Sequence, residues 1–135
     1  MIKSSLKISS LFATNQNGDE LIQVINPQKV NNSKNQFDLY LKFSVFGITK
    51  DSDFYIIVNV LNEDLCRNIH SSVQRIQNIH LNKGYAELSK GVYATSFTYK
   101  AAKTEYLPGN CRISITLIDN LTNEKIQNSS YIYLR

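Results

Sequence analysis

Residues 36–47 read QFDLYLKFSVFG, and this stretch decides the fold class. Its apolar side chains fall at every second position, at Phe37, Leu39, Leu41, Phe43 and Val45. The positions between them carry Asp38, Tyr40, Lys42 and Ser44. Because successive side chains of a strand point to opposite faces of its sheet, this alternation predicts a strand with one buried and one wet face.

Further segments show strand patterns of the same or a related kind. Residues 111–119, CRISITLID, alternate in the same way. Residues 54–62, FYIIVNVLN, are apolar at odd and even positions alike, which is typical of a central strand. Residues 6–12 alternate more weakly, through Leu6, Ile8 and Phe12. Shorter strand candidates lie at 20–25, 75–81, 85–89, 92–100 and 129–135.

The composition and the turn signals agree with a chain built from strands. Isoleucine, valine, tyrosine, phenylalanine and threonine together number 43, whereas alanine, the best helix former, numbers 5. Turn-forming residues separate the candidate strands, for example at 49–52, 107–110 and 119–123. We therefore predict that residues 1–135 form a single all-β domain, an antiparallel sandwich or barrel of about eight strands.

Residues 62–80 leave a helical alternative open. Four apolar residues recur there at helical spacing: Leu65, Ile69, Val73 and Ile76. Asn62 or Asp64 could cap the N-terminus of such a helix. Because two serines and several β-branched residues follow, we expect at most one helical turn, near 63–69.

The segment from Tyr106 to Thr122, YLPGNCRISITLIDNLT, carries a resemblance to a known family. A Pro-Gly turn, an alternating strand, and a following turn with Asp and Thr resemble the last hairpin of bacterial immunoglobulin-like domains. Gly109 can adopt a positive φ after the proline, and Asp119 or Asn120 can bond to its own turn. Cys111 stands where that pattern usually has a tyrosine. The resemblance implies that the sandwich is immunoglobulin-like.

Charge and hydropathy limit the range of partners. The net charge is +4, and the basic residues are scattered, whereas nucleic-acid binders usually concentrate them on one face. Oligonucleotide binding is therefore kept only as an alternative function. No run of 18 apolar residues occurs, so we expect no transmembrane segment. The N-terminal stretch is too polar for a signal peptide, and we expect a cytoplasmic location if Met1 is the native start.

Reactive side chains are few and do not form a known motif. The candidates for metal binding or nucleophilic catalysis are Cys66, His70, His80 and Cys111. They match no zinc or redox spacing, and the chain has no nucleophile elbow, phosphate-binding loop or metalloprotease motif. The alternative interpretation makes Cys66 and Cys111 small buried hydrophobic residues and places the two histidines at the surface or at strand edges. We expect no enzyme activity, no catalytic or metal-binding residues, no cofactor and no small-molecule ligand.

Acidic loop residues suggest a second alternative, a C2-like domain that binds calcium and then lipid. These residues are Asp51, Asp53, Glu63, Asp64 and Asp119. Calcium takes roughly six to eight oxygen ligands, largely from converging carboxylates. The loop at Asp119 offers only one carboxylate, and the ordinary turn preference of aspartate explains the same residues.

The tyrosines point to the leading functional prediction. Tyr40 lies on the polar face of 36–47, and Tyr131 and Tyr133 share one face of 129–135. Outward aromatic residues favour protein interfaces. We predict a non-enzymatic interaction or assembly module that binds a protein partner, or a second copy, through an exposed sheet face or edge strand. This prediction fails if Tyr131 and Tyr133 point into the core.

Overall fold

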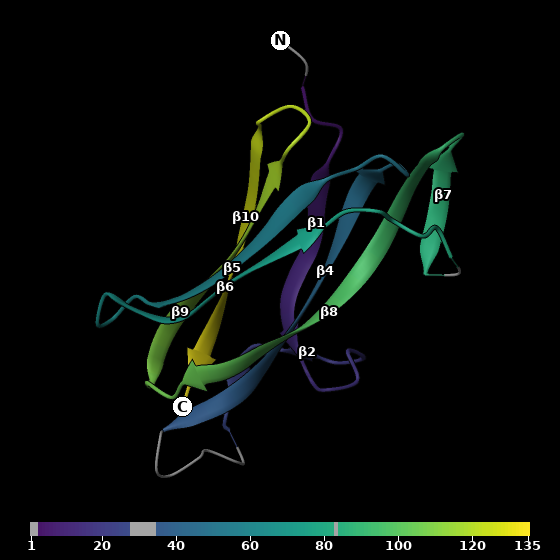
Figure 1. Cartoon of the computed structure of the whole chain (residues 1–135). Coiled ribbons are helices and arrows are strands. Elements are labelled where there is room, and N and C mark those ends of the chain that lie inside the picture. The colour runs from purple at the N-terminus through teal and green to yellow at the C-terminus, as the bar shows by residue number, and fades with distance from the viewer. Residues whose placement is uncertain (1–2, 28–34, 83) are drawn as a thin grey trace.

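The computed structural model describes residues 3–27, 35–82 and 84–135, which form two β-sheets packed face to face (Figure 1). Every element of regular secondary structure in these ranges is a β-strand. The first sheet has the order β2–β1–β4–β8–β7, with ranges Leu21–Ile22, Lys7–Thr14, Gln36–Ile48, Val92–Glu105 and Tyr85–Ser89. The second has the order β3–β10–β9–β5–β6, with ranges Val24–Ile25, Lys125–Leu134, Gly109–Asp119, Phe54–Asn62 and Arg67–Ile76.

The strand pairing confirms the predicted immunoglobulin-like β-sandwich, with ten strands in the described ranges instead of about eight. The described pairs are antiparallel except for β3 and β10, which run parallel. The predicted strand at 20–25 is divided into β2 and β3, which join different sheets. Within the described residues, no helix reaches the length and hydrophobicity that a membrane span requires.

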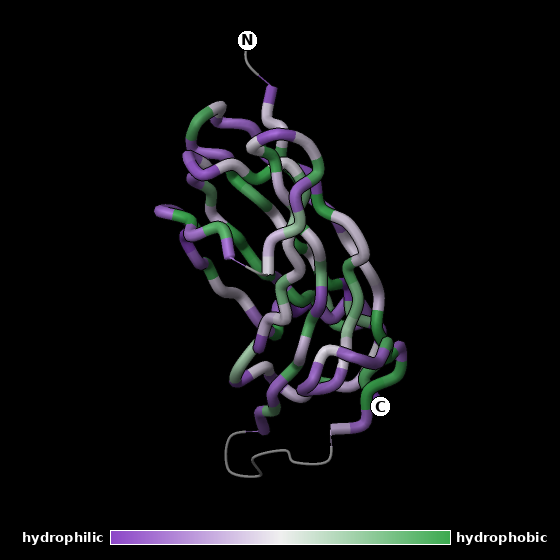
Figure 2. The backbone as a smooth tube through the Cα atoms, turned by 90° about the vertical axis from the view of Figure 1, so that its right-hand side faces the viewer, coloured by the Kyte–Doolittle hydropathy of each residue, from purple (hydrophilic) through white to green (hydrophobic). Residues whose placement is uncertain are grey.

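The core lies between β4 of the first sheet and β5 and β9 of the second. The alternating residues that the sequence assigned to the buried face of 36–47 are at most 6% exposed. The inward residues of β9 have no exposed surface: Cys111, Ile113, Ile115 and Leu117. Strand β5 has a hydrogen-bonded neighbour on each side, as predicted for 54–62. Figure 2 shows hydrophobic and hydrophilic residues alternating along the strands.

A bulge in β1 corrects the predicted face of Phe12. Ser9 pairs with Ser44 and Phe12 with Lys42, so Ser10 and Leu11 together face a single residue of β4. Ser10 has a φ of 57°. The extra residue reverses the alternation, because a bulge moves every later side chain to the other face. Leu11 is therefore buried, and Phe12 lies on the opposite face from the one that the sequence pattern predicted.

The sequence allowed one helical turn near 63–69. The structure instead has a hairpin turn over residues 63–66, followed by β6. The predicted capping contact exists, because Asn62 Oδ1 accepts a hydrogen bond from the Leu65 N–H at 3.0 Å. Beyond the turn, β-branched residues pair with β5 instead of continuing a helix. The strand predicted at 75–81 is correspondingly displaced, since β6 ends at Ile76.

The turn chemistry expected around β9 is present. Gly109 has a φ of 140°, and Asp119 Oδ1 accepts a hydrogen bond from the Leu121 N–H at 2.9 Å. Strands β9 and β10 then form the antiparallel hairpin whose pattern resembles bacterial immunoglobulin-like domains.

Gly47 generates a test of how the N-terminal segment packs. It has a φ of 85°, and a Cβ built on it would lie 2.0 Å from the Ser5 carbonyl oxygen. Gly91 has a similar φ of 77° but no atom within 4 Å of such a Cβ. We expect Gly47→Ala to lower the free energy of unfolding by about 1–3 kcal/mol more than Gly91→Ala, measured by urea unfolding. Equal losses would show that Ser5 does not pack on Gly47.

Candidate functional site: the open edge of strand β10

Among the residues that the structure describes, strand β10 is hydrogen-bonded to another strand on one side only over most of its length. Its partner β9 covers residues 125–134, whereas β3 pairs with only Tyr133 and Leu134 on the other side. The Tyr133 N–H donates to the Gln23 carbonyl at 2.9 Å, and the Arg135 N–H donates to the Ile25 carbonyl at 3.0 Å. Because backbone N–H groups alternate between the two sides of a strand, the N–H groups of residues 127, 129 and 131 point to the same side, where β3 is absent.

One of these edge amides has a local acceptor. The Ser129 N–H donates to the side-chain oxygen of Asn128 at 2.9 Å. An unpaired strand edge is a template for pairing with another strand, and a side chain that satisfies an edge amide competes with such pairing. Asn128 therefore protects part of the β10 edge.

Large apolar side chains surround this edge. Tyr131 is 61% exposed and Tyr133 is 42% exposed, so both point outward. Val24 lies opposite Tyr133 in the β3–β10 register, and it is exposed. Leu21, also exposed, lies beside Tyr131 across a groove. We call Leu21, Val24, Tyr131 and Tyr133 the β10 edge patch.

The groove has a volume of about 410 Å³ and lies between β1, the chain from β2 to β3, and β10. It is lined by Ser10, Leu11, Phe12, Ala13, Leu21, Ile22, Gln23, Ser130 and Tyr131. The lining contains no charged residue. The bulge at Ser10 turns Phe12 away from the core, so the same backbone irregularity that corrects the β1 pattern helps to form the groove.

The structure places the three predicted tyrosines at two separate places. Tyr131 and Tyr133 lie together at the β10 edge patch, whereas Tyr40 lies on the outer face of the first sheet. Tyr40 is half-buried and, with Gln16 and Lys100, lines a different depression of about 570 Å³. Sequence reasoning missed Leu21 and Val24, because their exposure depends on which sheet each two-residue strand joins.

Strand β6, at the opposite edge of the second sheet, is better protected than β10. Strand β6 contains a bulge where Val60 pairs with His70 and Leu61 with Asn68. An ion pair lies near each end of β6: Arg67 with Glu105 at 3.0 Å, and Arg75 with Asp53 at 2.7 Å. Bulges and charged side chains both disfavour strand addition. The seven residues from 125 to 131 carry a single charge, on Lys125.

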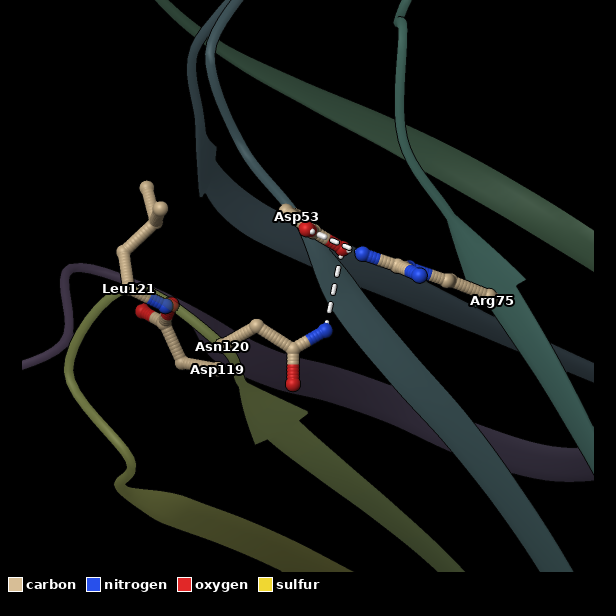
Figure 3. A network of polar contacts seen from close by, with 5 residues as sticks. All are labelled: Asp53, Arg75, Asp119, Asn120 and Leu121. Carbon is tan, nitrogen blue, oxygen red and sulfur yellow. Dashed lines mark hydrogen bonds and ion pairs between the residues drawn. The ribbon is translucent and has the colours of Figure 1, made fainter.

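Asp53 and Arg75 belong to a polar network at one end of the sandwich (Figure 3). The Asp53 carboxylate accepts two bonds from Arg75, at 2.7 and 3.0 Å, and one from the Asn120 side chain at 2.9 Å. The bonds from Arg75 and Asn120 lower the pKa of Asp53 from 3.8 to about 2. The network links the start of β5, the end of β6 and the β9–β10 turn, and therefore positions the beginning of β10.

Two further acidic residues considered for calcium, Asp119 and Asp64, make hydrogen bonds of their own. Asp119 accepts hydrogen bonds from the Ser4 hydroxyl at 2.6 Å and from the Leu121 N–H. Asp64 lies in the β5–β6 turn, where it accepts the Asn110 N–H at 2.9 Å. Among the residues that the structure describes, no group of three or more His, Cys, Asp or Glu side chains is placed to hold a metal ion.

The two cysteines are free and differ in their environment. Cys111 is buried on the inner face of β9, as predicted, and burial raises the pKa of its thiol to about 11. Cys66 is exposed in the β5–β6 turn. Because exposure is not expected of a small core residue, the interpretation of Cys66 as a buried hydrophobe is wrong. The hairpin turn brings its side chain out of the core.

His70 lies between the sheets and not beside Cys66. Its Nε2 is 3.0 Å from the Ser72 hydroxyl, which also bonds to the Tyr99 hydroxyl, and the His70 ring packs edge-on against Tyr99. Burial lowers the pKa of His70, and a backbone hydrogen bond to Ala102 opposes that shift. These contacts join β6 to β8 and hold the His70 ring between the two strands.

Several basic side chains have acidic partners. Besides Arg67 and Arg75, Lys100 lies 3.5 Å from Asp38, and Arg112 lies 3.9 Å from Glu63. A basic residue paired with a carboxylate is less able to neutralise a phosphate. The pairing thus gives no support to the oligonucleotide alternative.

Comparisons with known proteins identify the fold. A bacterial adhesin from Mobiluncus mulieris is similar at 9% identity with a TM-score of 0.57, over 96% of this chain and 49% of that chain. Spo0M, a sporulation control protein from Bacillus subtilis, is similar at 10% identity with a TM-score of 0.52, over 98% and 50%. The CooA pilin subunit from enterotoxigenic Escherichia coli is similar at 11% identity with a TM-score of 0.47, over 92% and 96%.

The similarities to the adhesin and to Spo0M concern the all-β fold alone. This chain spans about half the length of the adhesin and of Spo0M. No family model matches the sequence, and no curated protein matches it. These comparisons therefore give no information about the function of the β10 edge patch.

The exposure of Tyr131 and Tyr133 generates a second prediction. We expect Tyr131→Ser and Tyr133→Ser each to change the free energy of unfolding by less than about 1 kcal/mol, because their side chains are exposed. Leu134→Ala is the matched control on the same strand, because Leu134 is fully buried. It should cost about 2–5 kcal/mol in urea unfolding. A comparable cost for either tyrosine variant would show that the ring packs in the core.

The Asp53 network generates a prediction about acid stability. The native pKa of Asp53 lies below its ordinary value of 3.8, so its ionised form stabilises the fold above pH 3.8 and that stabilisation is lost as the pH falls toward about 2. We expect Asp53→Asn to lower the melting temperature at pH 7 and the difference from the wild type to shrink between pH 4 and pH 2. Asp51→Asn, in the same loop, is the control. A pH-independent difference for Asp53→Asn would contradict the network.

Proposed function

We propose that this chain is a non-enzymatic interaction module that binds an extended protein segment along the open edge of β10. The observation that carries the proposal is the one-sided pairing of β10 beside the β10 edge patch. The proposal includes the cytoplasmic location and the single-domain organisation of residues 1–135 expected from the sequence.

The edge supplies the main-chain part of the interaction. From residue 125 to residue 131, no described strand is hydrogen-bonded to β10 on the side that β3 covers at Tyr133 and Leu134, and β1 lies beside this edge across the groove. A strand added there would receive hydrogen bonds from edge N–H groups and donate to edge carbonyls. Main-chain bonds of this kind give affinity without depending on the partner's side chains.

The β10 edge patch and the groove supply the specificity. Tyr131 and Tyr133 are two residues apart on β10, so their side chains point to the same face of the sheet. The groove is uncharged, so it favours an apolar side chain of the partner over a charged one, which would lose its hydration there. We therefore expect the bound segment to carry a large apolar residue near Tyr131.

Site-specific photo-crosslinking tests this proposal. We would place the photo-reactive amino acid p-benzoylphenylalanine at Tyr131, at Tyr133 or at the control position Phe46, in the cells that make the protein. Phe46 is 38% exposed on the first sheet, which is close to the exposure of Tyr133. We expect protein adducts at positions 131 and 133 and at least several-fold fewer at 46. No adduct at 131 and 133, or equal yields at all three positions, would contradict the proposal.

A further inference from the structure

We propose that the extended segment is the β10 strand of a second copy, paired antiparallel with this one about a twofold axis at Asn128. This inference rests on the proposed function, because it names the partner at the same edge. It follows from the backbone directions, the side-chain register and the charge distribution of residues 125–131.

The backbone directions restrict the register. The Tyr133 N–H points to the β3 side, so the odd-numbered residues of β10 present their N–H and carbonyl groups at that edge. In an antiparallel pair, two such residues must lie opposite each other to exchange both hydrogen bonds. Since β3 occupies the edge from Tyr133 onward, the segment of β10 with no hydrogen-bonded neighbour on this side among the described strands is residues 125–131, and its centre is Asn128.

Pairing about Asn128 makes the two outer faces complementary. Lys125 faces Tyr131 of the second copy, and Gln127 faces Ser129 of the second copy. The ammonium group can contact the aromatic ring, and the amide can bond to the hydroxyl. The two Lys125 side chains lie at opposite ends of the paired segment. No like charges therefore meet in this register, in which every edge position from 125 to 131 has a partner.

Asn128 limits this association in the free chain. Its side-chain oxygen accepts the Ser129 N–H at 2.9 Å. In the paired register, the Gln127 carbonyl of the second copy would accept that N–H instead, so the Asn128 side chain must rotate away. The exchange replaces one hydrogen bond by another, and the net gain comes from the remaining edge groups and from the tyrosines.

Disulfide trapping tests the register directly. We would introduce Asn128→Cys in a Cys66→Ser background, since Cys66 is exposed, and oxidise the purified full chain. At a non-hydrogen-bonded antiparallel pair the two Cα atoms lie about 4.5 Å apart, within the range of a disulfide. Ser130→Cys is the matched control, because in this register its two copies lie about 14 Å apart along the strands.

We expect a covalent dimer for the variant at 128 and a monomer for the variant at 130 on a non-reducing gel. No dimer at 128, or equal yields at both positions, would overturn the register. Cys111 remains in both variants, but it is buried and its thiol pKa is raised, so it contributes little background.

Sedimentation equilibrium of charge variants tests the proposed contacts without a disulfide. Tyr131→Lys places a lysine opposite Lys125 of the second copy, and we expect the dimer dissociation constant to rise about tenfold. Adding Lys125→Glu should restore the wild-type value, since each position then faces the opposite charge. A loss that the second substitution does not reverse would contradict the Lys125–Tyr131 contact.

The outcomes separate this inference from the proposed function. If the wild-type chain stays monomeric at millimolar concentration but forms photo-adducts with another protein at Tyr131, self-pairing is wrong and the interaction edge stands. If the photo-adducts have the mass of a dimer, both are supported. If neither photo-adducts nor dimers form, both are wrong.

Discussion

The dry contact between the inner faces of β4, β5 and β9 is the constraint on which the rest of the structure depends. Leu41, Val58 and Ile115 have no exposed surface, and each belongs to a strand whose next side chain points to the outer face. A slip of one residue along β9 would bring Arg112 and Ser114 into this layer and expel the isoleucines. The burial of alternate residues therefore sets the register of the second sheet, including the pairing of β9 with β10.

The same constraint explains where the strands are irregular. A bulge bends a strand and moves every later side chain to the other face, so the pattern of buried residues changes there. β1 has such a bulge at Ser10, and β4 has one at Gly47, where the positive φ suits glycine. The first of these bulges buries Leu11 and turns Phe12 toward the groove. The shape of the candidate site is thus partly a consequence of keeping the core closed.

A sandwich of two open sheets always has edge strands. In this chain the edge strands differ in how well they are protected against the addition of another strand. Strand β6 has a bulge and an ion pair near each end, and β7 is only five residues long. Strand β3 protects the C-terminal end of β10 but is only two residues long. The Asp53–Arg75–Asn120 network holds the turn before β10, and its three residues lie outside β10 itself. The proposed interaction uses the edge with the fewest such protections.

The amino-acid sequence by itself determined the all-β class, the buried faces of β4 and β9, the central place of β5 and the turn at Gly109. These features depend on neighbouring residues, because side-chain alternation and turn preference are local properties. The sequence pattern could not locate the bulge that reverses Phe12, the hairpin at 63–66 or the division of 20–25 between two sheets. Only the tertiary structure decided which strands lie at edges and that Leu21 and Val24 accompany Tyr131 and Tyr133. Strand order depends on contacts between residues far apart in the chain, and the periodicity of one strand does not identify which strands pair with it.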